Sequence, residues 1–488
     1  MKVIVIGSGF SGLSAASLLA KQGYKVTLLE KNETIGGRAR RFSTQGFTFD
    51  MGPSWYWMPD VFERYFSLFG HTTSDFYELT RLSPSYTVVW HDGIDEIPAD
   101  KEELYAFFEK YESGSSKKLE AFLKDAAFKY KVGMNDFVHQ PALNILEFAR
   151  FDLVKKAMGI SLFTSISKVI RSNFTHPKLI ELLEFPVLFL GATPQNTPAL
   201  YSLMNHADMT LGTWYPQGGM HKIIEAFETI AKEQGVNILT NQEVLSVKEE
   251  RGKLSHVITA DKSYTCDVVV NSADYHHFEQ QVLPEALRQY SPKYWKKKTL
   301  APSSLLYYIG LDAKIPRLHH HNLFFDADFE AHAKEIYSTH EWPKDPLFYA
   351  CIPSKTDSSV APTGGENLFL LLPTSTMIDD TEEVKERYFE LMANRILKHT
   401  GFDIRQHIVY FRSYAQQDFK KDYHAYRGNA YGLANTLKQT AFLKPKMKSK
   451  KIDNLFYTGQ LTNPGPGVPP SIISGEVISK LVAQEYPL

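Results

Sequence analysis

The chain has 488 residues, 43% of them hydrophobic and 22% charged, a composition ordinary for a globular protein of more than one domain. Its 54 Lys and Arg nearly balance its 55 Asp and Glu, so it lacks the surplus of cations that nucleic-acid binding needs. The two cysteines, Cys266 and Cys351, have no paired spacing. This argues against a disulfide framework or a thiolate metal site and predicts two inert thiols in a cytoplasmic protein.

The first thirty residues predict a β-α-β unit. Residues 2–6 are a short, β-branched apolar run typical of a buried parallel strand. Residues 10–22 have helical spacing and stop before Gly23, and residues 25–30 are predicted as a second strand. Glycines interrupt the opening apolar run, so we do not predict a signal peptide. No run approaches the ~20 apolar residues needed to cross a bilayer.

A dinucleotide fingerprint lies inside this unit. The segment Gly7-Ser8-Gly9-Phe10-Ser11-Gly12 matches G-x-G-x-x-G, in which the glycines allow a tight turn, a close approach of the pyrophosphate and close helix–strand packing. The helix N-terminus offers free N–H groups to the phosphates. Glu30, followed by Lys31, is placed to accept hydrogen bonds from ribose hydroxyls and disfavours the 2′-phosphate of NADP. The alternative is a glycine-rich turn in an unrelated α/β fold.

The rest of the chain alternates between strand-rich and helical stretches. No linker or repeat separates them, so we expect one compact unit in which a nucleotide-binding domain is interrupted by insertions. Predicted strands are residues 86–90, 237–240, 243–248, 254–259, 268–270, 305–310, 368–372, 408–411 and 455–458. Predicted helices are residues 102–111, 116–131, 143–170, 382–399 and 470–484.

Two segments after Glu30 favour FAD over NAD. Gly36-Gly37-Arg38 combines small residues, which let the chain pass beside a cofactor, with an arginine able to reach a phosphate or the flavin. This spacing resembles the glutathione-reductase-like FAD proteins of the amine oxidase superfamily. Residues 45–54, which end in Gly52, Pro53 and Ser54, resemble the segment that approaches the flavin in that superfamily.

Motifs in the middle and at the far end narrow the resemblance. Residues 454–459 resemble the last strand of the nucleotide domain, which ends at Gly459 beside the flavin. Residues 464–469 (PGPGVP) are similar to the C-terminal signature of the bacterial-type carotenoid (phytoene) desaturase family, and residues 214–220 to its W-x-P-x-G-G segment. The resemblance implies that Val244, Gly467 and Val468 also bind FAD. It also implies that the helix after Pro469 and Pro470 points at the flavin N1/O2 edge.

The same resemblance implies an α/β fold with a Rossmann-like, glutathione-reductase-like FAD-binding domain. This domain is expected to be interleaved with a mixed α+β substrate domain and a helical, membrane-facing part. The expected FAD-binding pieces are residues 1–80, 214–290 and 421–488. Residues 81–213 are expected to form the helical part and residues 291–420 the substrate sheet. Asn463 replaces a histidine common in the family, and Gln460 and Pro470 replace small residues at positions expected near the flavin.

The implied reaction is desaturation of a C40 carotenoid, phytoene or a partly desaturated product, by hydride transfer to FAD. It needs few protein groups, and no catalytic residue is predicted. A 1-hydroxycarotenoid 3,4-desaturase is the near alternative; a flavin amine oxidase and a carotenoid isomerase are alternatives of other classes. No metal site is predicted, because the run His319-His320-His321 is interpreted as a solvated loop.

A long apolar carotenoid needs an apolar tunnel and a route from the membrane. Aromatic residues gather beside the expected flavin segments, at Trp55, Tyr56, Trp57 and Phe62, and residues 185–191 could line a tunnel, although ordinary core packing explains either set equally well. Residues 143–170 and the basic run 444–451 could meet an anionic surface or form a solvated face. The hypothesis is a cytoplasmic protein held peripherally, through residues 143–170, on the inner face of the cell membrane.

Overall fold

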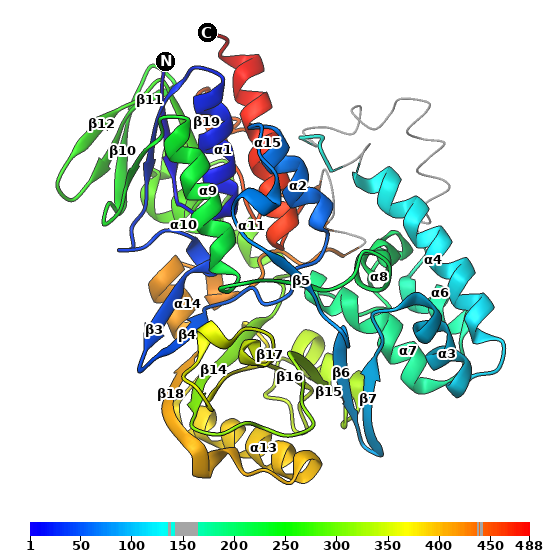
Figure 1. Ribbon diagram of the computed structural model, residues 1–488. Helices are drawn as coiled ribbons and strands as arrows, with labels where there is room; N and C mark the ends of the chain where they lie inside the picture. The colour runs from blue at the N-terminus through cyan, green and yellow to red at the C-terminus, as the bar shows by residue number, and fades with distance from the viewer. Residues whose placement is uncertain (135–137, 142–163, 437–438, 440–442) are drawn as a thin grey trace.

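Two sheets organise the chain in the computed structural model, which describes residues 1–134, 138–141, 164–436, 439 and 443–488 (Figure 1). One is a five-stranded sheet that contains the first and the last strand of the described chain, and the other is a seven-stranded sheet below it in Figure 1. A three-stranded sheet and two short two-stranded ribbons complete the β structure of these residues.

The five-stranded sheet has the order β19-β13-β1-β2-β9, and every pair of neighbours is parallel. Its strands are short, apolar and mostly buried, as parallel strands covered on both faces must be. One face packs against α1, α9 and α15, and the other packs against the antiparallel strands β10, β11 and β12. The bounds are β1 Lys2–Ile6, β2 Lys25–Leu29, β9 Asn237–Leu239, β13 Val268–Asn271, β19 Leu455–Tyr457, α1 Phe10–Lys21, α9 His221–Glu233, α15 Val468–Glu485, β10 Val244–Glu250, β11 Lys253–Thr259 and β12 Ser263–Thr265.

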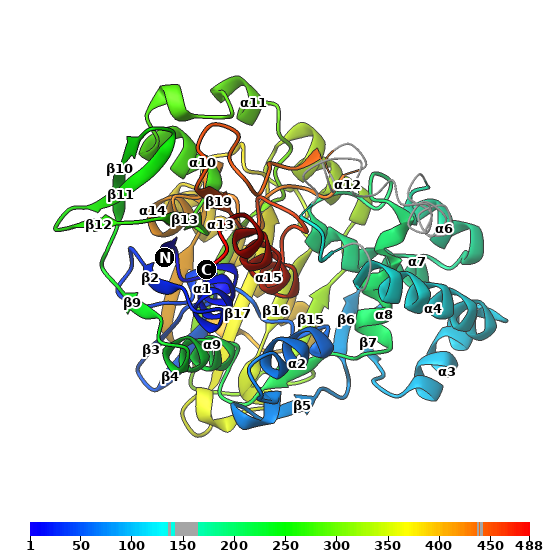
Figure 2. The same cartoon turned by 90° about the horizontal axis from the view of Figure 1, so that it is seen from above.

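Helices α1 and α15 lie side by side although they are distant in sequence (Figure 2). Gly475 of α15 allows this approach, because a Cβ there would stand 2.6 Å from Ser11 O and from Ser14 Cβ. Ser14 Oγ also donates a hydrogen bond to Ile472 O (3.0 Å). The helix that follows the glycine loop therefore contacts both the parallel sheet and its neighbour α15.

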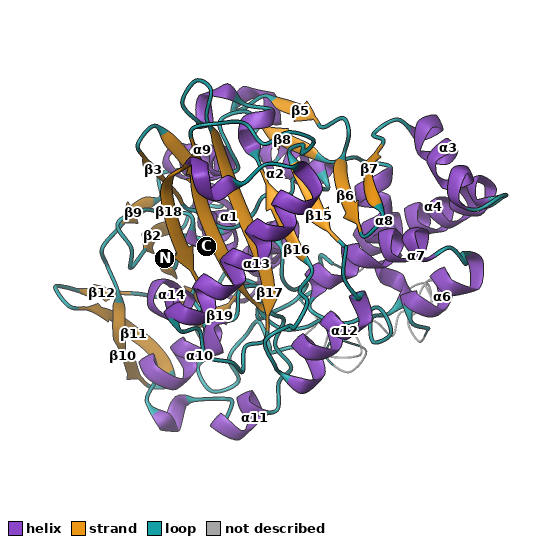
Figure 3. Cartoon of the chain, turned by 90° about the horizontal axis from the view of Figure 1, so that it is seen from below, coloured by secondary structure: helices purple, strands orange, loops and turns teal. Residues whose placement is uncertain are grey.

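The seven-stranded sheet has the order β18-β14-β17-β16-β15-β6-β7. The pair β15–β6 is parallel and the other neighbours are antiparallel. Helix α13 packs on one face, which Figure 3 shows from below, and the opposite face joins the core that also contains α1 and α15. The bounds are β6 Tyr86–Trp90, β7 Gly93–Ile97, β14 Ser303–Leu311, β15 His321–Phe324, β16 Phe348–Cys351, β17 Glu366–Thr374, β18 Ile408–Tyr414 and α13 Glu382–Thr400.

Smaller elements join these bodies. A group of helices lies beside β6 and β7 on the right of Figure 1, and two ribbons run along the junction of the sheets. The helices are α3 Lys101–Tyr111, α4 Ser115–Val132, α6 Ile166–Asn173, α7 Pro177–Glu184 and α8 Leu203–Met209. The ribbons pair β3 Arg41–Thr44 with β4 Phe47–Asp50, and β5 Leu79–Arg81 with β8 Trp214–Pro216. The remaining helices are α2 Pro59–Ser67, α10 Tyr275–His277, α11 Pro292–Lys296, α12 Phe329–Lys334 and α14 Gln416–Tyr423.

Several sequence-based expectations need correction. The run after residue 318 is not a solvated loop, because His320 and His321 are 4% and 0% exposed where β15 begins between β6 and β16. The basic run is not one solvated face either, since Lys444 is 2% exposed and donates to Pro464 O. Most of the expected helix 143–170 lies outside the described residues. Within the described residues, no helix is long and apolar enough to span a membrane.

A buried acid on α8 gives the first testable prediction. Asp208 is 2% exposed and accepts a hydrogen bond from Tyr86 OH (2.8 Å). Burial raises its pKa from 3.8 to about 7, so the unfolded chain releases this proton first as the pH rises. Stability should therefore fall between about pH 4 and pH 7. Asp208→Asn should stabilise the protein at pH 8 by roughly 2–4 kcal/mol and change little near pH 4, as measured by denaturant unfolding at both pH values.

The near-isosteric asparagine keeps an acceptor for Tyr86, and Thr213 Oγ1 lies 3.4 Å from the other carboxylate oxygen. An equal loss of stability at both pH values would show that Asp208 is needed as an anion and would contradict this prediction.

Candidate cofactor and substrate site

One cavity of about 400 Å³ runs from the carboxyl ends of the parallel strands to the inner face of the seven-stranded sheet. Every sequence-predicted site residue except Gly12 lines it, although these residues come from five distant segments. They are Gly7, Ser8, Gly9, Glu30, Lys31, Gly37, Arg38, Gly52, Pro53, Ser54, Val244, Gly459, Gly467 and Val468. The cavity lies at the strand ends where open α/β sheets bind their ligands.

The glycine loop has the geometry that a bound pyrophosphate needs. Gly7 has a φ of +92° and donates from its N–H to Leu29 O (2.8 Å), which closes the turn after β1. A Cβ on Gly9 would meet nothing within 4 Å, so the loop leaves open space beside this backbone. The first N–H groups of α1 have no partner within the helix, and Gly9 provides no side-chain cap for them. These donors are available to an anion.

Gly12 lies beneath the loop rather than on the cavity wall. A Cβ at this position would stand 2.0 Å from Gly7 O and 3.0 Å from Ser272 Oγ. Its part is to let α1 approach the turn after β1, as expected for the third glycine of the fingerprint.

Glu30 is 4% exposed and is held from both sides. Its Oε2 accepts from Ser8 N (3.0 Å) and Ser8 Oγ (2.6 Å), and its Oε1 accepts from Asn32 N and Asn32 Nδ2 (both 2.9 Å). The carboxylate thus fixes the glycine loop to the end of β2. A ribose hydroxyl would have to replace one of the two side-chain donors, Ser8 Oγ or Asn32 Nδ2.

Glu30→Gln should weaken FAD binding. An amide in place of the carboxylate turns one acceptor into a donor that faces other donors, and hydrogen bonds to a charged group contribute about 1.5–3 kcal/mol. We expect the Kd for FAD to rise by about tenfold or more, measured by titrating flavin fluorescence. Glu33→Gln is a matched control, because Glu33 is exposed on the same loop. Equal affinities of the two variants would contradict the prediction.

Arg38 lines the cavity. Its Nη2 donates to Asn429 O (3.1 Å), its guanidinium lies 5.0 Å from the Tyr423 ring centroid, and its buried Nε has no partner among the residues that the structure describes. With its amide oxygen turned toward Arg38, Gln460 accepts from both Nη atoms (2.9 and 3.2 Å). Gln460 therefore helps to hold the guanidinium of Arg38 in place. The position of Gln460 in the C-terminal motif did not indicate this role.

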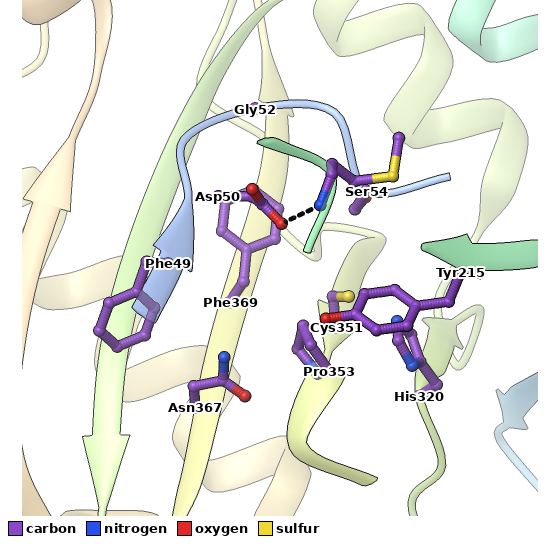
Figure 4. Close-up of a pocket in the computed structure, with 11 residues that line it drawn as sticks. Phe49, Asp50, Gly52, Ser54, Tyr215, His320, Cys351, Pro353, Asn367 and Phe369 are labelled. Atoms are coloured by element: carbon purple, nitrogen blue, oxygen red, sulfur yellow. Dashed lines mark hydrogen bonds between the residues drawn. The ribbon is translucent and has the colours of Figure 1, made fainter. Parts of the chain in front are cut away.

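The segment after β4 runs along the cavity at Gly52, Pro53 and Ser54, and β4 itself ends in a helix cap. Asp50 accepts hydrogen bonds from Met220 N (2.7 Å) and His221 N (2.9 Å) at the start of α9; the first is drawn in Figure 4. A Cβ on Gly219 would stand 2.8 Å from Asp50 Oδ2. The Gly-Gly of the central motif therefore lets Asp50 reach the N-terminus of α9.

The C-terminal motif forms the approach to α15, which begins at Val468 rather than at Pro470. Prolines have no N–H to donate, so Val468 is the only one of the first three helical residues that can donate to a ligand. Ser471 N already bonds to Gly467 O (3.0 Å). Asn463 was expected near the flavin, but its Nδ2 donates to Gln140 O (2.9 Å), whereas Gln460 and Pro470 do line the cavity.

The end of the cavity away from the glycine loop is apolar and aromatic. Trp55 and Trp57 contact each other at 5.1 Å between ring centroids, while Tyr56 and Phe62 stack in the core at 4.2 Å. Phe185 packs against Trp55 (6.3 Å) instead of lining the cavity itself. The apolar lining comes from several elements: Trp55, Trp57, Met58, Met204, Leu306, Phe369, Leu371 and Phe419.

Burial shifts the pKa of several titratable groups of the wall. Burial lowers the pKa of His277 to about 4 and raises the pKa of Tyr349 well above 10. Burial also raises the pKa of Asp274 to about 6. Its two oxygens accept from His277 N (2.8 Å) and Tyr426 N (3.2 Å). Lys31, whose pKa burial lowers, donates to Lys421 O (2.6 Å).

The sequence analysis did not predict one segment that lines the cavity, residues 272–274, which follow β13. The rule that ligands bind at the carboxyl ends of parallel strands would have found it. Other missed residues carry no local signal, because folding of distant segments brings them together. They are Gln242, Glu243, His277, Ser304, Tyr349, Phe369, Tyr423 and Tyr431.

These observations fit FAD. Within the described part of the chain, the open space at Gly9, the free N–H groups of α1 and the unpartnered, buried Nε of Arg38 suit a pyrophosphate at one end. A Cβ on Gly37 would stand 3.2 Å from Gly9 Cα, so the Gly-Gly-Arg segment must pass close to the glycine loop. The aromatic and apolar side chains at the other end suit a planar ring.

Known proteins resemble this chain over nearly its whole length. A family model described as flavin containing amine oxidoreductase matches residues 10–482. The chain is 41% identical over 486 residues to a carotenoid 3,4-desaturase of Haloarcula japonica, covering 99% of this chain and 98% of that protein. It is 30% identical over 492 residues to a 4,4'-diapophytoene desaturase (4,4'-diaponeurosporene-forming) of Staphylococcus aureus, covering 98% and 97%.

The fold has solved counterparts. An oxidoreductase from Methanosarcina mazei superposes with a TM-score of 0.61 at 18% sequence identity, over 98% of this chain and 100% of that chain. At this identity the likeness concerns the fold alone.

Proposed function

The chain belongs to the flavin-containing amine oxidoreductases and, within them, to the carotenoid desaturases, with FAD as its cofactor. From this premise we propose that it introduces a carbon–carbon double bond at the 3,4 position of a partly desaturated carotenoid. The 41% identity to a carotenoid 3,4-desaturase favours that bond. The 30% identity to a diapophytoene desaturase supports phytoene or a product of it as the second candidate substrate.

The proposal rests on one observation: the expected cofactor site and the expected substrate site share a single cavity. Residues of the dinucleotide fingerprint and a wall of apolar and aromatic side chains line the same space. A soluble amine would need a polar pocket, whereas this wall offers Trp55, Trp57, Phe369 and Leu371 beside the expected flavin position. Apolar walls of this kind suit an elongated hydrocarbon.

The residues of the chain bind and orient the substrate. A bound FAD would supply the acceptor for the hydride, and the proton lost from the neighbouring carbon would also pass to the flavin. The aromatic wall holds the polyene in register and excludes water. Tyr349 OH donates to Ser54 Oγ (3.0 Å), and because burial raises its pKa it stays protonated. His277 is neutral at pH 7 as well, so neither of these two side chains adds a charge to the cavity wall.

Product mass tests the proposal. The purified protein with FAD is incubated with a 1-hydroxylated carotenoid in liposomes, and in parallel with phytoene. We expect the loss of two hydrogens per step, and faster with the hydroxylated carotenoid. Conversion of phytoene alone would move the assignment to the earlier step. An unchanged mass with a changed absorption spectrum would mean isomerisation, and oxidation of an amine with no carotenoid product would mean an amine oxidase.

Cellular placement and domain boundaries belong to the proposal as well. Because the substrate dissolves in lipid, we propose that the protein docks on the inner face of the cell membrane from the cytoplasm. The segment expected to dock, residues 143–170, lies largely outside the described residues, so co-sedimentation with anionic liposomes at low salt is the direct test. Boundaries after residues 80, 213, 290 and 420 stay predictions that limited proteolysis can check.

A further inference from the structure

Three side chains with nitrogen or sulfur ligand atoms meet behind the aromatic wall of the cavity. His321 and Cys351 are paired residues in the antiparallel strands β15 and β16, and His320 precedes β15. Their exposed fractions are 4% for His320, 0% for His321 and 1% for Cys351. One ligand atom from each lies within 4.8 Å of the other two.

The imidazoles are only half satisfied. His320 Nδ1 bonds to Thr356 Oγ1 (2.8 Å) and His321 Nδ1 to Tyr349 OH (2.6 Å). In both rings Nε2 is buried without a partner among the described residues. Leaving a buried polar atom unpaired costs about 1–3 kcal/mol, so two neighbouring cases on one strand call for a reason.

A small second cavity adjoins the cluster. It has a volume of about 20 Å³, room for about one water molecule. His320, Cys351 and Tyr215 lie on one side of it and Asp50 on the other (Figure 4). Gly52, Ser54 and Phe369 line both this cavity and the large one. The cluster is therefore separated from the cofactor and substrate site by a single layer of residues.

We propose that His320, His321 and Cys351 bind one borderline-soft cation, of which Zn²⁺ is the probe of choice. Nitrogen and sulfur donors select such ions over Mg²⁺ and Ca²⁺, which take oxygen. His320 binds through its free Nε2. His321 binds through Nδ1, which lies 3.7 Å from Cys351 Sγ and exchanges its hydrogen bond with Tyr349 OH for the bond to the ion. Zinc bonds of about 2.0–2.3 Å at a tetrahedral angle place such atoms about 3.5 Å apart. The small cavity provides the fourth position for a water molecule.

The surroundings suit this ion. Burial lowers the pKa of His320 to about 3, so its imidazole is neutral, the form that binds metals. Burial raises the pKa of the Cys351 thiol to about 12, and metal binding has to displace its proton, so one proton leaves as the S–metal bond forms. Trp55 stacks on His321 at 4.1 Å between ring centroids and 10° between planes. The ion would thus brace β15 and β16 behind a residue that lines the substrate end of the large cavity.

The test uses the full chain loaded with FAD and stripped of metals by a chelator. Titration with Zn²⁺ should bind one ion per chain and release about one proton, measured calorimetrically in buffers of different ionisation enthalpy. Co²⁺ should give the intense near-ultraviolet band of a cobalt–thiolate bond. Cys351→Ser should remove that band and weaken Zn²⁺ binding at least a hundredfold, and His320→Gln should weaken it about as much. Mg²⁺ should not bind.

The second cysteine of the chain provides a matched control variant. Cys266→Ser removes the only other cysteine, also buried, and should leave stoichiometry and spectrum unchanged. Flavin absorbance reports whether each variant is folded, and the cobalt spectrum of the unaltered protein needs no variant. Absence of stoichiometric binding by that protein, a cobalt band without thiolate character, or wild-type binding by Cys351→Ser would each overturn the proposal. None of these outcomes depends on whether the enzyme desaturates a carotenoid.

Discussion

Gly12→Ala is expected to abolish FAD binding and to destabilise the fold. The added Cβ would stand 2.0 Å from Gly7 O, and both atoms belong to backbone segments that cannot swing away. Overpacking of a rigid site usually costs about 1–3 kcal/mol, occasionally more, and a contact this short with a backbone atom belongs at the upper end. The helix must retreat from β1, which moves its N–H groups away from the pyrophosphate. Purified protein should lack flavin absorbance and unfold at lower denaturant concentration.

Gly9→Ala is the matched control for that prediction. Gly9 has an ordinary φ of −69°, and a Cβ there would meet nothing within 4 Å. This variant should fold, with a loss of about 1 kcal/mol or less from the poorer N-cap, while its methyl group occupies the cofactor's space. FAD affinity should fall without a comparable loss of stability. Equal instability of the two variants would contradict the distinction between Gly12, which allows close packing, and Gly9, which leaves space for the cofactor.

Glu476→Gln should lower the free energy of unfolding by roughly 2 kcal/mol at neutral pH, because Glu476 is buried but its cationic partners Arg64 and Lys480 are 43% and 54% exposed. Glu476 is 5% exposed on α15 and accepts from Arg64 Nη1 (2.5 Å) and Nη2 (2.7 Å) of α2 and from Lys480 Nζ (2.7 Å). The amide leaves these cations facing a neutral group that accepts fewer bonds. Arg64→Met and the double variant complete a cycle, in which coupling near zero would contradict the prediction.

The same carboxylate sets a pH window. Its folded pKa lies at about 2, below its ordinary 4.5, because the hydrogen bonds from Arg64 and Lys480 outweigh the opposing effect of burial. A group with a depressed pKa stabilises the fold fully above its unfolded pKa, and this contribution is lost as the pH falls toward the folded value. The difference between wild type and Glu476→Gln should therefore shrink between about pH 4.5 and pH 2. A difference that stayed constant over this range would show that the charge is not its source.

Local order at the first strand, helix and second strand was predictable from the sequence, because turn chemistry and apolar periodicity act over a few residues. Helix α1 ends at Lys21, one residue before the predicted end. The glycine roles at Gly7 and Gly12 also followed from the fingerprint, since their steric consequences arise between neighbouring turns. The motifs shared with a family placed Gly459 and Gly467 on the same cavity as Gly9, which periodicity alone could not do.

Pairing between distant strands was not predictable. Strands β15 and β16 were missed although β13, which has the same length, was predicted. Histidines break the apolar pattern where β15 begins. His320 and His321 are buried because β15 lies between β6 and β16, which long loops bring together. Asn463 bonds to Gln140, a partner that no local rule could indicate. The apolar end of the cavity depends on such pairings. The sequence could therefore predict that its lining is apolar, but not which residues form it.

The contact between α1 and α15 also has a consequence in time. Ser14 bonds to Ile472, a residue 458 positions later, and a ribosome adding about 5–20 residues per second needs roughly 20 to 90 s to cover that distance. During this interval the glycine loop exists without the helix that braces it. We therefore expect the nascent chain to be unable to retain its cofactor, and flavin supply during synthesis to matter less than flavin supply after release.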